Sequence, residues 1–151
     1  MRAHPLLGVV SAKKPPRSQR AFVDGAAQGN PGQASIGVVF QDADGAVIHS
    51  VSKAIGVSTN NEAEYLALIL ALQEALMNGV KELDIFADSE LVVKQFNGDY
   101  RVKEPSLKIL ALLASHLRKG FKKVTLTHIP REKNQLADRE ANRALDQETL
   151  F

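Results

Sequence analysis

Cysteine and tryptophan are both absent from this chain of 151 residues. The absence of cysteine excludes disulfide bridges, thiolate metal sites and cysteine nucleophiles, and it argues against a secreted scaffold that depends on disulfides. No apolar run approaches the roughly 18 residues that a membrane-spanning helix needs. Any metal ion must therefore be held by carboxylates or histidine, and we expect no membrane partner.

The length fits one domain with a substantial core. Residues 1–20 contain five basic residues and no acidic one, which leaves 14 basic and 17 acidic residues, a net charge of −3, in the remainder. We expect residues 1–19 to form a flexible basic arm, which either attracts phosphate backbones or only improves solubility. Its apolar run is too short for a secretory signal, so we expect a cytoplasmic protein.

The hydrophobic pattern predicts an α/β fold. Three strands joined by short turns, at 20–27, 33–41 and 46–55, predict an antiparallel meander. A largely apolar helix follows at 62–79. The remaining elements alternate between strand and helix, which indicates that the sheet becomes parallel; they are a strand at 81–87, helices at 89–96 and 105–119, a strand at 122–128 and a helix at 134–145. We place the folded domain at 20–146 and a tail at 147–151.

The stretch AFVDGAAQGNPG, from Ala21 to Gly32, begins as an apolar strand that ends at an aspartate, and glycines and a proline follow at once. An ionised carboxylate in a buried strand is unfavourable unless a cation meets it. Asp24 is therefore either part of an Asx turn or β-turn, or a ligand of a metal ion. Taken alone, the stretch fits both interpretations.

Three further acidic residues stand where the pattern expects apolar or capping residues. Asp88 follows the strand at 81–87, Glu64 lies one turn inside the apolar helix, and Asp138 lies on the apolar face of the last helix. Singly, Asp88 and Glu64 could cap helices and Asp138 could pair with an arginine. Together with Asp24 they would repel one another strongly near one core unless cations bind them.

A carboxylate cluster without sulfur ligands suits Mg²⁺ or Mn²⁺. Such a cluster can hold two ions about 3.5 to 4 Å apart, an arrangement used for phosphodiester hydrolysis. One ion would lower the pKa of an attacking water, and the other would stabilise the leaving 3′ oxygen. His128 ends the last strand ten residues before Asp138 and could reach the same rim, or could simply be a surface residue.

Four motifs, DGAAQGNPG, TNNEAEY, ADSELVVKQ and HIPREKNQLAD, resemble in this order the catalytic motifs of the type 1 ribonuclease H family. The resemblance covers about Arg20 to Leu145. It implies a ribonuclease H-like fold, with a mixed five-stranded sheet whose first three strands are antiparallel, flanked by helices. It also implies an endoribonuclease that hydrolyses the RNA strand of RNA/DNA hybrids with two Mg²⁺ ions, or Mn²⁺ as a substitute, and leaves 5′-phosphate and 3′-hydroxyl ends.

The resemblance also implies residue roles. The positions that match metal-binding, catalytic acids are Asp24, Glu64, Asp88 and Asp138. His128 matches a histidine that assists proton handling or product release. The positions that match contacts to the hybrid are Asn30, Thr59, Asn60, Asn61 and Glu90. Amides suit such contacts because they donate and accept hydrogen bonds, and the family reads 2′-hydroxyls in the minor groove. Glu90 replaces a glutamine of some members and could instead tune the metal site.

Many bacterial members carry a basic handle with tryptophan before the last strand, and this chain has neither the tryptophan nor the length for it. Other basic residues then either bind the substrate or simply form a solvated surface. The candidates are Arg101, Lys103, Lys108, Arg118, Lys119, Lys122 and Lys123. Cleavage of double-stranded RNA or RNA-DNA junctions, or binding of hybrids without cleavage, are the competing hypotheses. We expect a monomer without an obligate protein partner.

Overall fold

The computed structural model describes residues 18–149. Its elements are β1 (Ser18–Gly29), β2 (Gly32–Gln41), β3 (Val47–Ser58), α2 (Asn60–Met77), β4 (Glu82–Ala87), α3 (Glu90–Phe96), α4 (Pro105–Arg118), β5 (Lys123–His128), the 3-10 helix η1 (Arg131–Lys133) and α5 (Gln135–Thr149). Most of the predicted arm lies outside the described residues, although its last two residues, 18 and 19, already belong to β1. Helix α5 likewise continues three residues into the predicted tail.

The five strands form one mixed sheet in the order β3-β2-β1-β4-β5. Strands β1, β2 and β3 pair antiparallel, whereas β4 pairs parallel with both β1 and β5. This confirms the predicted sheet. The expectation that the first strand ends at Asp24 is wrong, because β1 stays paired with β2 as far as Gly29, which lies opposite Gly32. Asp24 is therefore in the middle of a strand.

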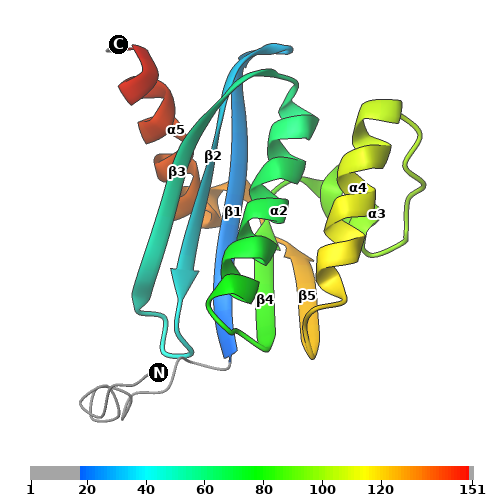
Figure 1. Ribbon diagram of the computed structural model, residues 1–151. Coiled ribbons are helices and arrows are strands. Elements are labelled where there is room, and N and C mark those ends of the chain that lie inside the picture. The colour runs from blue at the N-terminus through cyan, green and yellow to red at the C-terminus, as the bar shows by residue number, and fades with distance from the viewer. Residues whose placement is uncertain (1–17, 150–151) are drawn as a thin grey trace, which may run out of the picture.

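Helices cover both faces of the sheet (Figure 1). Helix α2 packs on β1 and β2, and α4 packs on the outside of α2. The largest buried side chains, among them Val38, Leu68, Leu72 and Ile85, lie in the core that includes α2 and the sheet. Successive side chains of a strand point to opposite faces, so the alternate residues of β1, β2 and β3 face the side on which α5 packs.

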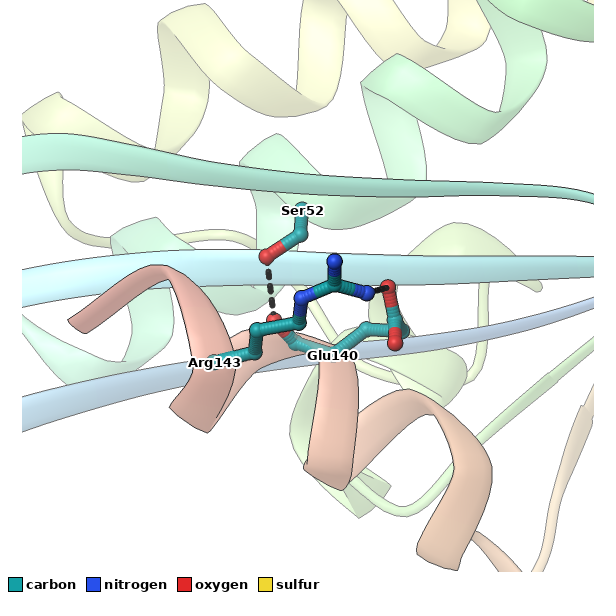
Figure 2. A network of polar contacts seen from close by, with 3 residues as sticks. All are labelled: Ser52, Glu140 and Arg143. Carbon is teal, nitrogen blue, oxygen red and sulfur yellow. Dashed lines mark hydrogen bonds and ion pairs between the residues drawn. The ribbon is translucent and has the colours of Figure 1, made fainter. Parts of the chain in front are cut away.

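Helix α5 is fixed to the other face by small residues and hydrogen bonds. The hydroxyl of Ser52 in β3 donates to the main-chain carbonyl of Glu140 at 2.5 Å. Within α5, Nη1 of Arg143 lies 3.7 Å from Oε1 of Glu140 (Figure 2). Ser35 in β2 donates to the carbonyl of Ala141. These contacts fix α5 across β2 and β3.

Helix α2 begins two residues earlier than the pattern predicts, because Thr59 caps it. Oγ1 of Thr59 accepts from the main-chain N–H of Glu62 at 3.1 Å, and Oε1 of Glu62 accepts from the N–H of Thr59 at 2.8 Å, which is a complete capping box. Among residues 18–149, no helix is both long and apolar enough to cross a membrane.

Candidate active site

Two glycines let a helix approach Asp24 from each face of the sheet. A Cβ atom on Gly25 would lie 2.3 Å from the main-chain carbon of Ala63, so only glycine allows α2 to pack this closely on β1. The N–H of Gly25 then donates to Oε1 of Glu64. The close contact thus places the carboxylate of Glu64, near the start of α2, beside β1.

Gly37 allows α5 to pack closely on the sheet in the same way. It is the cross-strand neighbour of Asp24 in β2, and a Cβ there would lie 2.4 Å from the main-chain oxygen of Ala137. Helix α5 therefore packs directly against β2 beside Asp24. The carboxyl group of Asp138, the next residue of α5, comes within hydrogen-bonding reach of Asp24.

The four predicted acids meet at one point of the fold. Carboxylate oxygens of Asp24, Glu64 and Asp88 lie within 4.8 Å of one another, and Asp138 adjoins Asp24. Asp24 and Glu64 are buried, with 3% and 9% of their surfaces exposed, and Asp88 is half-buried. The structure thus brings together residues 24, 64, 88 and 138 of the sequence, while their role as metal ligands stays a prediction.

Burial and, after it, the nearby charges of Glu64 and Asp88 together raise the pKa of Asp24 from its ordinary value to about 10. Burial also raises the pKa of Glu64 to about 7, although hydrogen bonds from Asp24 and the N–H of Gly25 and the charge of Arg131 act against this. Such a cluster holds either protons or cations. At neutral pH a cation that binds there displaces protons from these carboxyls.

One oxygen atom of the cluster fits a cation directly. Within the described residues, the buried Oδ2 of Asp24 accepts no hydrogen bond from a donor group, and the carboxyls within its reach can share a proton only when one is bound. This buried oxygen has no hydrogen-bond donor, and other carboxylates surround it. Oxygen ligands of this kind are the ones that Mg²⁺ and Mn²⁺ prefer. The residues present therefore fit a divalent hard cation.

The acids face a cavity of about 390 Å³, which opens between the start of α2, the end of β4 and η1. Its lining residues are Asp24, Gly25, Ala26, Ala27, Asn60, Asn61, Glu64, Asp88, Ser89 and Arg131. Two of the predicted substrate contacts thus lie on its wall. Asn30 is next to them, since its Oδ1 accepts from the N–H of Asn60 at 3.0 Å. A carboxylate-lined cavity with amides at its edge suits a phosphodiester substrate held by cations.

The remaining predicted residues lie around the cavity rather than on its wall. Thr59 caps α2 just before Asn60. His128 is exposed at the end of β5, opposite Ala87 and so beside the strand end that carries Asp88. Glu90 is exposed as the first residue of α3 and is not a lining residue.

The candidate basic residues for substrate grip separate into different places. Arg101 and Lys103 line a second cavity, of about 520 Å³, near the side chains of Asp99 and Glu104. Arg118 is turned inward: its Nη1 donates to the carbonyl of Phe96 at 3.0 Å and its guanidinium lies over the Phe96 ring.

Two residues of the site were missed in the sequence. Asn134 is buried, and its Nδ2 donates both to the carbonyl of Val23, at 2.8 Å, and to Oδ2 of Asp88, at 2.9 Å. Arg131 lines the cavity, and its positive charge lowers the pKa of Glu64. Both lie inside the motif HIPREKNQLAD, which was the available signal, but their partners are distant in sequence.

Comparison with known proteins identifies the family. The family described as "Reverse transcriptase-like" matches residues 22–144. The chain is 40% identical over 140 residues to Ribonuclease HI of Halobacterium salinarum, covering 91% of this chain and 70% of that protein. The chain belongs to the type 1 ribonuclease H family. As a type 1 ribonuclease H it is a nuclease, a hydrolase, and its family implies dependence on a divalent metal.

Solved ribonuclease H structures show the same fold. RNase H1 from Halobacterium salinarum superposes with a TM-score of 0.84 at 41% identity, over 86% of this chain and 98% of that one. LC11-RNase H1 in complex with an RNA/DNA hybrid gives 0.83 at 43% identity, over 87% and 99%. Bifunctional protein Rv2228c of Mycobacterium tuberculosis is 43% identical over 124 residues. The matched segment covers about a third (34%) of that longer protein.

Proposed function

We propose that this protein is an endoribonuclease that hydrolyses the RNA strand of RNA/DNA hybrids and leaves 5′-phosphate and 3′-hydroxyl ends. The observation that carries the proposal is the cluster of Asp24, Glu64 and Asp88 at the wall of an open cavity, with Asp138 beside Asp24. The hybrid bound by the related LC11-RNase H1 supports the choice of substrate. We further propose that the protein acts as a cytoplasmic monomer.

The residues that would hold two Mg²⁺ ions, or Mn²⁺ in their place, are Asp24, Glu64, Asp88 and Asp138. When bound, such ions supply activation of a water molecule and neutralisation of the charge that develops on the leaving oxygen. The chain contributes the rigid placement of the acids. Asp24 is held in mid-strand, Glu64 by the N–H of Gly25, and Asp88 by the amide of Asn134.

Amide groups at the cavity edge are suited to hold the hybrid. Asn60 and Asn61 lie on the wall, and the hydrogen bond from the N–H of Asn60 to Asn30 fixes the β1–β2 turn against the start of α2. Amides can contact both sugar hydroxyls and base edges in a wide minor groove, where the 2′-hydroxyl distinguishes RNA from DNA. Thr59, at the exposed helix start, is placed to meet a phosphate of the DNA strand.

Proton transfer falls to His128, which is exposed at the rim next to the strand end that carries Asp88. An imidazole there can take up or release a proton near neutral pH as the strand is cleaved and released. Arg131 lines the same cavity and offers a fixed positive charge to a phosphate. Glu90 would contact the hybrid only from outside the cavity, at the start of α3.

The test is a panel of labelled substrates of one sequence: an RNA/DNA hybrid, double-stranded RNA, double-stranded DNA and a duplex with one RNA-DNA junction. We expect cleavage of the hybrid's RNA strand with Mg²⁺ or Mn²⁺, and none with chelator. Faster cleavage of double-stranded RNA or of the junction would replace the proposed specificity. Tight hybrid binding that is indifferent to chelator, without cleavage, would identify a binding module instead.

A further inference from the structure

The outer face of α4 is apolar and uncovered. Helix α4 lies on the outside of the helical layer, against α2 (Figure 1). Its inner face buries Leu107 and Ala114, whereas Ile109 and Leu112 are 71% and 72% exposed and Leu113 is 44% exposed. Residues three and four apart are neighbours on a helix, so these three form one continuous stripe. Large exposed aliphatic side chains that adjoin one another mark interaction sites.

Positive charge accompanies the stripe, on α4 and in the turn that follows it. Residues 105–123 contain five lysines and arginines and no acidic residue, although the whole chain has a net charge of only +2. Lys108, Lys119 and Lys122 are exposed. In the part of the chain that the structure describes, the ion pairs join His49 to Glu74 and Arg143 to Glu140, so no carboxylate neutralises these lysines there. We call the three aliphatic residues and these three lysines the α4 surface.

The α4 surface does not line the acid cavity. The acid cavity is lined from β1, α2, the junction of β4 with α3, and η1. Lys122 precedes the first residue of β5. It lies at the opposite end of that strand from His128, about 20 Å away for an extended strand. Phosphate contacts by the lysines would also leave Ile109 and Leu112 in water. A polyanion therefore explains the charge of this surface but not its apolar stripe.

We propose that the α4 surface docks an acidic amphipathic helix of another protein. Apolar side chains spaced three and four residues apart on that helix would cover the stripe, and its flanking carboxylates would meet the lysines. A second copy of this chain is a poorer match, because pairing α4 with α4 would bring two positive rims together. A membrane surface calls for a longer apolar face with aromatic side chains, and α4 contains no aromatic residue. Docking there leaves the acid cavity open.

The probe is a designed, fluorescently labelled helical peptide with leucines at positions i, i+3, i+4 and i+7 and glutamates around them. Anisotropy titration with the full chain should give saturable binding that weakens as salt rises. Ile109→Ser/Leu112→Ser and, separately, Lys119→Glu/Lys122→Glu should each weaken binding about tenfold or more. The matched control Val57→Ser/Met77→Ser removes side chains of similar exposure, 66% and 72%, elsewhere and should leave binding unchanged.

Hybrid cleavage by Ile109→Ser/Leu112→Ser should equal that of the wild type, which separates this proposal from the nuclease function. Urea unfolding of each variant checks that it folds. Several outcomes would overturn the proposal: no saturable binding, equal binding by all variants, or equal affinity for a peptide with lysines in place of the glutamates. If the wild type bound anionic vesicles and the same variants did not, the partner would be a membrane instead. If sedimentation showed a dimer that these variants abolish, the partner would be a second copy of the chain.

Discussion

Asn134 joins three elements through one amide group. Its Nδ2 donates to the carbonyl of Val23 in β1 and to Asp88 after β4, while the residue itself precedes α5. Because Asn134 is buried, water cannot replace these bonds. It therefore determines how Asp88 is oriented toward Asp24.

Replacing Asn134 with alanine should lower the free energy of unfolding by about 1–3 kcal/mol, since a buried carbonyl and a carboxylate lose their donor. It should also lower kcat, because Asp88 is no longer held in place. Urea unfolding and steady-state kinetics measure the two effects. Asn142→Ala is the control, as its amide also contacts a carboxylate of the site, Asp138, but at 3.4 Å and in an exposed position. Equal unfolding free energies for the two variants would contradict this role.

Between elements, the separation of β1 and α2 depends on Gly25. A Cβ at this position would meet main-chain atoms of Ala63 and Glu64 within 2.5 Å, and main chain cannot move aside as a side chain can. Gly25→Ala should therefore destabilise the protein by about 3 kcal/mol or more. It should also weaken Mg²⁺ binding, because Glu64 moves away from Asp24.

The matched control for this substitution is Gly120→Ala. The added Cβ would meet the side chain of Leu76 at 2.8 Å, which can rotate away, so its effect on stability should be much smaller. Thermal unfolding and Mg²⁺ titration calorimetry distinguish the two variants. If Gly25→Ala bound Mg²⁺ as the wild type does, the close contact would not be what positions Glu64.

At this scale the sequence could predict the features that depend on residues close together along the chain. Apolar periodicity, Asn-Gly pairs and the capping residues lie within a few positions of the elements that they define, so all the main strands and helices were found. The length of β1 was not predicted, because its pairing with β2 as far as Gly29 depends on another strand. The contacts of Gly25 with α2, and of Gly37 with α5, were missed for the same reason.

The candidate site shows the same limit. Its four acids could be identified because each lies in a motif whose order and spacing are visible along the chain. Asn134 was missed because its two partners are 111 and 46 residues away, and its place in the motif HIPREKNQLAD does not indicate that its side chain is a buried donor. Arg131 carries no local sign that it faces Glu64.

For the whole molecule, the acid cluster couples stability to pH and metal. The pKa values of Asp24 and Glu64 are raised on folding, to about 10 and about 7, so the folded protein binds protons that the unfolded chain releases near pH 4. Without metal, the contribution of these two groups to stability should therefore be fully present below that pH and should be lost as pH rises through about 7 for Glu64 and about 10 for Asp24. Divalent cations that bind only the folded state should oppose this loss.

Thermal unfolding with chelator should give a lower Tm at about pH 8 than at about pH 5, and Mg²⁺ should raise the Tm more at the higher pH, where fewer protons compete for the cluster. Asp24→Asn removes a carboxyl that must take up a proton on folding at about pH 8, so without metal it should be more stable than the wild type at that pH and respond less to Mg²⁺. A Tm shift by Mg²⁺ that is equal at both pH values, or absent, would show that the cluster does not bind the ion as inferred.

The most direct test of the nuclease site is single-turnover cleavage of a labelled RNA/DNA hybrid by the wild type, Asp24→Asn and the exposed control Asp44→Asn. With Mg²⁺, the wild type and Asp44→Asn should cut the RNA strand at equal rates and leave 3′-hydroxyl ends that a polymerase extends. Asp24→Asn should be slower by at least about a thousandfold, equivalent to about 4 kcal/mol of transition-state stabilisation. Cleavage by Asp24→Asn at the wild-type rate would contradict the central role of Asp24.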